Sequence, residues 1–63
     1  MKILIADRLA KVRHALSILL QENPGWDVSG RAKNPQDLLS KISLHKPDVL
    51  LLDFYLLGST QQR

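Results

Sequence analysis

The hydrophobic period of this chain changes four times within 63 residues, and this alternation restricts the fold more than any other feature. Residues 3–6 and 49–52 are continuous apolar runs, which is typical of strands that are buried on both faces. Residues 26–33 alternate apolar and polar side chains, which predicts a half-exposed strand at a sheet edge. Residues 9–21 and 35–45 instead repeat apolar side chains at three- and four-residue steps, as amphipathic helices do.

The resulting order, strand-helix-strand-helix-strand, predicts an α/β fold. Strands that are joined by single helices run parallel with right-handed crossovers, so we expect a βαβαβ unit with a parallel three-stranded sheet. The helices should then cover the sheet with their apolar stripes. We expect these stripes to consist of Leu9, Val12, Ala15, Leu16, Leu19 and Leu20 in the first helix and of Leu38, Leu39, Ile42 and His45 in the second.

Turn and capping signals bound both predicted helices. Asp7 is expected to start the first helix, because aspartate accepts backbone N–H groups at an N-cap. Residues 23–25, Asn-Pro-Gly, should end it. Asn34 fits the N-cap of the second helix, with Pro35 at its first position, and Lys46 and the proline after it should end that helix.

Size and composition exclude several classes of protein. About sixty residues bury only ~60% of their unfolded surface, so the chain must pack very well, associate or belong to something longer. The absence of cysteine excludes disulfide frameworks and thiolate chemistry. The apolar runs are too short for a membrane span, and the net charge of +3 comes from scattered cations that indicate no nucleic-acid footprint. We therefore expect a cytoplasmic protein that binds no membrane.

Two carboxylates follow the buried strands directly. Asp7 closes the first strand and Asp53 the third, and the C-terminal ends of parallel strands share the edge of the sheet where ligands bind. A pair of carboxylates can hold a hard cation such as Mg²⁺, and one carboxylate can attack a phosphoryl group. From spacing alone the plainer explanation is favoured, with Asp7 as a helix cap and Asp53 as a turn residue after a strand.

The order of residues adds a family resemblance. Segments 2–7 (KILIAD), 12–16 (VRHAL), 26–30 (WDVSG) and 46–53 (KPDVLLLD) together resemble the receiver domain of bacterial two-component response regulators over nearly the whole chain up to residue 58. The family fold is flavodoxin-like, with five parallel strands in the order 2-1-3-4-5, so the chain corresponds to its N-terminal half. The resemblance implies a phosphoacceptor rather than an enzyme, with a sensor histidine kinase as partner.

The resemblance also implies roles for single residues. Asp53 matches the phosphoacceptor, and Asp7 matches the first acid of a pair that binds Mg²⁺ together with Asp53 and a backbone carbonyl, here that of Tyr55. Arg8 stands where the family has the second acid, so its positive charge either substitutes for the metal or blocks it. The switch hydroxyl and the lysine of the family lie on its fourth and fifth strands, which nothing in this sequence matches.

The half-length match leaves two explanations open: a truncation, or a half-domain that is stabilised by self-association. We expect a truncated receiver-like domain at residues 1–58 and a flexible tail at residues 59–63. An apolar third strand at a sheet edge favours a homodimer across that edge, or exchange of the segment from Phe54 onward. The alternative function is therefore a receiver-fold interaction and dimerisation module without phosphotransfer. Contact with nucleic acid would require a downstream output domain.

Overall fold

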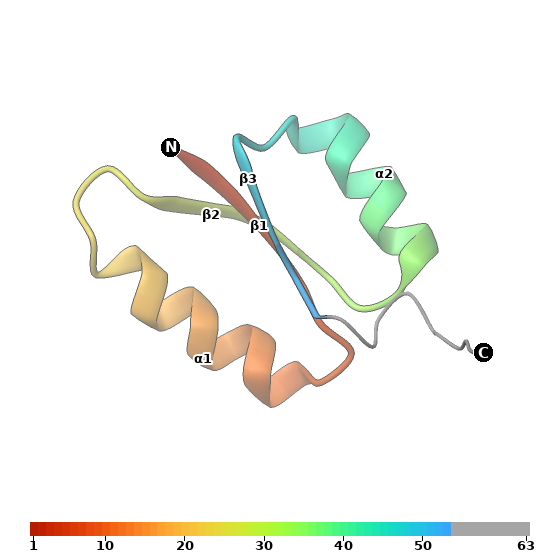
Figure 1. The fold of residues 1–63 in the computed structure, drawn as a ribbon, viewed down its shortest axis with the longest axis horizontal. Helices are drawn as coiled ribbons and strands as arrows, with labels where there is room; N and C mark the ends of the chain where they lie inside the picture. The colour runs from red at the N-terminus through yellow and green to blue at the C-terminus, as the bar shows by residue number, and fades with distance from the viewer. Residues whose placement is uncertain (54–63) are drawn as a thin grey trace.

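The computed structural model describes residues 1–53, and they form a parallel α/β unit. The strand order is β2-β1-β3, and both pairings with the central strand are parallel. Figure 1 shows the two helices on opposite sides of this sheet. The predicted βαβαβ unit, half of a flavodoxin-like fold, is thereby confirmed. The elements are β1 (Lys2–Ala6), α1 (Ala10–Gln21), β2 (Asp27–Ala32), α2 (Pro35–His45) and β3 (Val49–Leu52).

Two predictions fall on the remainder of the chain. The domain boundary at residue 58 and the tail at residues 59–63 lie outside the described residues. Within residues 1–53, no helix is long and apolar enough to cross a membrane.

The core is built around β1, as its continuous apolar run predicts. Ile3, Leu4, Ile5 and Ala6 are all buried, because β1 has a strand on each side and a helix over each face. The register with β2 shifts by one residue between Ile3 and Leu4, which leaves Ser29 without an opposite residue. The buried cluster around β1 consists of Leu4, Ala6, Ala32 and Leu38, with Ile42 packed against it.

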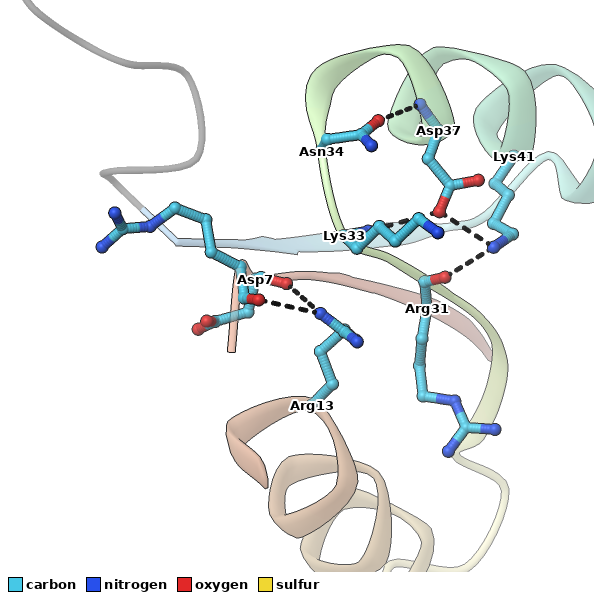
Figure 2. Close-up of polar contacts among 8 residues, drawn as sticks. Asp7, Arg13, Arg31, Lys33, Asn34, Asp37 and Lys41 are labelled. Atoms are coloured by element: carbon cyan, nitrogen blue, oxygen red, sulfur yellow. Dashed lines mark hydrogen bonds and ion pairs between the residues drawn. The ribbon is translucent and has the colours of Figure 1, made fainter. Parts of the chain in front are cut away.

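The start of α2 has the capping that the sequence predicts. Asn34 is the N-cap, and its side chain accepts a hydrogen bond from the backbone N–H of Asp37 at 2.8 Å. The Asp37 carboxylate in turn accepts from the backbone N–H of Lys33 at 3.2 Å and from Lys41 Nζ at 3.1 Å (Figure 2). These bonds satisfy amides that a helix start otherwise leaves to water, and they fix where the chain leaves β2 and enters α2.

The start of α1 differs from the prediction for Asp7. The helix begins at Ala10, and its N-cap is Leu9, which makes no side-chain capping bond. Asp7 instead accepts a hydrogen bond from the backbone N–H of Leu9 at 2.9 Å. Its carboxylate therefore fixes the turn before the helix rather than the first helical turn, because two further residues separate the strand end from the helix.

The predicted apolar stripes are only partly buried. Leu9 and Leu19 on α1 are each 58% exposed, and Leu39 on α2 is 69% exposed, so these three expectations are wrong. Ser17 is buried in their place, with its hydroxyl donating to the carbonyl of His14 at 2.8 Å. The physical reason is that each helix contacts the sheet along one narrow face, and no described element covers its far side.

The strand β3 forms where the sequence predicts it, but it is not buried. Its four residues are each about 40% exposed, because β1 is the only described strand beside it. The expectation of a fully buried run was therefore wrong, whereas the expectation of an apolar strand at a sheet edge is met within residues 1–53.

Gly30 marks the closest approach between α2 and the sheet. A Cβ atom at this position would lie 2.9 Å from Leu4 Cδ1 and 3.0 Å from His45 Cδ2. These distances are shorter than an ordinary van der Waals contact, so the last turn of α2 reaches β2 only because residue 30 has no side chain.

Candidate functional site

The C-terminal edge of the sheet brings together the two carboxylates that the sequence singles out. The backbone N–H of Asp53 donates to the carbonyl of Ala6 at 2.7 Å, and the backbone N–H of Asp7 donates to the carbonyl of Ala32 at 3.0 Å. Both bonds continue the ladder by one residue beyond the strands. The main chain therefore places Asp7, at the end of β1, beside Asp53, at the end of β3.

Arg8 is the direct neighbour of the candidate phosphoacceptor. Its Nε atom lies 3.4 Å from Asp53 Oδ2, a contact that is both a long hydrogen bond and an ion pair. The side chain of Asp53 is 16% exposed and that of Arg8 is 55% exposed. Because one partner is largely in water, the pair contributes little to stability. Its effect on the site is chemical: it places a positive charge against the carboxylate oxygen.

Arg13 fixes the loop that carries the other two residues. Its Nη1 atom donates to the backbone carbonyl of Asp7 at 2.7 Å and to that of Arg8 at 3.2 Å. In Figure 2 the Arg13 side chain rises from the first turn of α1 toward the backbone at Asp7. Sequence reasoning missed this positioning role. The available signal was a long donor side chain in the first helical turn, within reach of carbonyls that precede the helix.

The donor set fits a divalent cation poorly in this arrangement. No group of three histidine, cysteine or acidic side chains within residues 1–53 is placed to hold a metal ion. Tyr55, whose carbonyl was predicted as a ligand, lies outside the described residues. Mg²⁺ can be held by one or two carboxylates with several waters, but here the carboxylate of Asp53 already has the Arg8 guanidinium beside it. A cation would have to displace that charge or share the oxygens with it.

Comparisons with known proteins identify relatives of this chain. No family model matches the chain. It is similar to protein-glutamate methylesterase/protein-glutamine glutaminase 1 of Oleidesulfovibrio alaskensis, with 40% identity over 52 residues, which is 82% of this chain and 14% of that protein. The proteins of that name from Clostridium acetobutylicum and Bacillus subtilis are 38% and 40% identical over 52 residues, 82% of this chain and 15% of each relative.

The chain thus spans about one seventh of the length of the curated relatives that it matches. The matched region is the N-terminal, receiver part of these relatives and not their catalytic part. Receiver domains of this kind are phosphoacceptors in two-component signalling. With its βαβαβ unit and the two carboxylates at the C-terminal edge of the sheet, the chain belongs, as an N-terminal half, to the response regulator receiver family.

Proposed function

We propose that Asp53 accepts a phosphoryl group from a sensor histidine kinase and that Arg8 supplies the positive charge beside it. The observation that carries this proposal is the pair of Arg8 and Asp53 at the C-terminal end of β3, where ligands bind to open parallel sheets. The chain receives the group and performs no turnover of its own. The esterase activity in the names of the relatives belongs to those much longer proteins.

The proposed step is a displacement at phosphorus. A carboxylate oxygen of Asp53 forms the new bond to phosphorus, while the bond from phosphorus to the donor atom breaks and its electron pair leaves with the donor. The donor, a phosphohistidine nitrogen, then takes a proton from solvent. Negative charge lies on the three non-bridging oxygens throughout, so a cation at this position stabilises the transition state.

Arg8 has suitable chemistry for that stabilising role. A guanidinium stays charged at all relevant pH values and presents several N–H donors that match the spacing of phosphate oxygens. Its Nε atom already contacts Asp53, and its largely exposed side chain has room to turn from the carboxylate to an incoming phosphoryl group. Under this proposal the guanidinium takes the place of Mg²⁺ beside the phosphoryl oxygens.

The decisive experiment is intact mass measurement after incubation with a small-molecule phosphodonor, with and without Mg²⁺. We expect a single phosphoryl adduct that is lost in Asp53→Asn and kept in Asp27→Asn, a matched variant of an exposed carboxylate far from this edge. Circular dichroism establishes that each variant is folded. A folded chain without an adduct, or an adduct that survives in Asp53→Asn, contradicts the proposal.

The role of Arg8 needs its own variant. Arg8→Gln should slow adduct formation by about tenfold or more if the guanidinium stabilises the phosphoryl oxygens. Arg8→Asp restores the acid that the family has at this position and should make the reaction depend on Mg²⁺. Adduct formation that is faster in Arg8→Gln, without added metal, would instead mean that the guanidinium blocks the site.

A second function is favoured by a different observation. The four residues of β3 are apolar, each is about 40% exposed, and within residues 1–53 only β1 pairs with this strand. The outer edge of such a strand offers backbone N–H and C=O groups to another chain. We infer that two copies pair through β3, which would make the chain a dimerisation module with or without phosphotransfer.

Light scattering tests this inference at micromolar concentrations of the folded chain. We expect twice the mass of the monomer, about 14 kDa from a chain of 7.1 kDa. A cooperatively folded monomer would exclude the dimer.

A further inference from the structure

A cleft lies at the C-terminal end of β2, and none of Asp7, Arg8 and Asp53 lines it. It has a volume of about 440 Å³ and lies where the N-terminal halves of the two helices meet the end of β2. We call it the β2-edge cleft, and Figure 2 shows most of its side chains together. The residues that give it its character are Arg13 and His14 from α1, Arg31 and Lys33 at the end of β2, and Asp37 and Lys41 from α2.

The charge of this cleft is one-sided. Four cationic side chains line it, and Asp37 is the only carboxylate among the lining residues. The charge of Asp37 is already engaged, because Lys41 Nζ lies 3.1 Å from its Oδ2 atom. Positive charges that gather around an open hollow raise the local concentration of anions more than the same charges do when they are spread evenly over a surface.

The four cations differ in how they are held. Arg13 donates to the carbonyls of Asp7 and Arg8, and Lys41 donates to the carbonyl of Arg31 at 2.7 Å. The guanidinium of Arg31 and the ammonium of Lys33, by contrast, make no hydrogen bond or ion pair within residues 1–53. Arg13 and Lys41 are thus held by backbone carbonyls, whereas the N–H donors of Arg31 and Lys33 are available to a ligand.

We propose that the β2-edge cleft binds a small anion that bears phosphate groups. A guanidinium binds two oxygens of one phosphate at once, and a lysine ammonium beside it can engage another oxygen or a second phosphate. The cleft has the volume of an ordinary small-molecule site. Its ligand would lie on the β2 side of the C-terminal edge, whereas Asp53 lies on the β3 side, and the test below measures binding without phosphoryl transfer, so its failure is distinguishable from failure of the phosphoacceptor proposal.

A plainer explanation of the same residues is that charged side chains protect an edge strand from pairing with other chains. The two explanations differ in one property. Protection requires only charge near the strand, whereas a binding site requires particular donors in particular places. An experiment that removes one charged side chain at a time therefore distinguishes the two explanations.

The test is calorimetric titration of the full 63-residue chain with inorganic pyrophosphate. We expect saturable binding with one site per chain. Arg31→Gln and Lys33→Gln should each raise the dissociation constant by about tenfold or more, since each removes one charge-assisted donor. Neither side chain makes an internal bond, so both variants should fold. Lys11→Gln is the matched control, because Lys11 is an exposed cation on α1 outside the cleft.

Three outcomes decide the proposal. A loss of affinity that is confined to Arg31→Gln and Lys33→Gln supports it. An equal loss in Lys11→Gln, or heats that never saturate, would show general attraction to a basic surface and would overturn it. A second titration with ADP identifies the source of the phosphate: equal affinity means that the phosphates alone are bound, and tighter binding means that the cleft also accepts a nucleoside.

Discussion

The two edge strands of this sheet pair with the same central strand but have opposite character. β2 carries charged and small residues, both helices pack against it, and its last residue, Ala32, is fully buried. β3 consists of four large apolar residues, each about 40% exposed. An edge with charged side chains resists pairing, whereas an apolar edge invites it. The comparison teaches that the side chains of β2 disfavour pairing with a further strand, whereas those of β3 favour contact with another polypeptide segment.

The largest effect is expected at Gly30 in β2. An alanine there would place its Cβ against the Cδ1 atom of Leu4, whose side chain is fully buried, and against the His45 ring. Gly30→Ala should lower the free energy of unfolding by about 1–3 kcal/mol, which denaturant titration measures. Ser29→Ala is the control, because its hydroxyl makes only a 3.4 Å contact with the Ile3 carbonyl. Equal stability of the two variants would mean that the close packing around Gly30 does not contribute to the stability of the fold.

The next effect concerns β3. Leu51→Lys places a charge in the apolar edge strand and should weaken self-association by at least about tenfold, or ~1.4 kcal/mol. Sedimentation at several protein concentrations measures the change. Ser40→Lys adds the same charge at an exposed site on α2 and should leave association unchanged. If both lysines weaken association equally, net charge rather than the β3 edge controls it.

A smaller effect is expected where the chain enters each edge strand. Gly25 precedes β2 and has φ of +84°, whereas Lys46 shortly before β3 has φ of +49°, a conformation that costs free energy for any residue with a Cβ. Lys46→Gly should therefore raise the free energy of unfolding by about 0.5–1 kcal/mol in thermal or denaturant unfolding. Gly25→Ala should lower it. A Lys46→Gly variant that is less stable would show that the lysine side chain makes a contribution that outweighs its backbone strain.

The smallest effect is pH-dependent and lies in the β2-edge cleft. The hydrogen bond from Lys41 lowers the pKa of Asp37 below its ordinary value of 3.8, with a further contribution from the backbone N–H of Lys33. A folded-state pKa that lies below the unfolded one gives stability above about pH 4, and this stability is lost as pH falls through the lowered folded value. Melting temperatures between about pH 2 and 6 should thus fall less steeply in Asp37→Asn. Identical slopes would mean that Asp37 contributes nothing to acid stability.

The fold was predictable because the periodicity of the sequence is unusually clear. Only a few topologies are compatible with parallel strands that are linked by single helices. The N-cap residue Asn34 and the helix-starting Pro35 also predict the first residue of α2 correctly. Burial was less predictable. An apolar residue such as Leu39 or Leu19 fits a helical stripe in the sequence, but whether it is covered depends on what packs against it, and no local pattern carries that information.

The candidate site, too, was predictable only in part. That Asp7 and Asp53 lie at one edge followed from their places at the strand ends, and the backbone bonds to Ala32 and Ala6 explain why. The contact of Arg8 with Asp53 required a side-chain conformation, which the sequence does not specify. The β2-edge cleft escaped sequence reasoning altogether, because its cations are scattered along the chain and converge only when both helices fold back onto β2.

The position of β1 at the centre of the sheet has a consequence for how the chain is made. Of the three described strands, this one is synthesised before the other two, and both of its partners lie downstream, beginning at residues 27 and 49. At about 5–20 residues per second, this apolar strand waits ~2–10 s for its second neighbour. A nascent chain in this interval exposes Ile3 to Ala6, the residues that are later hidden most completely. Chaperone capture and aggregation during translation should therefore concentrate on the first strand, however stable the finished sheet is.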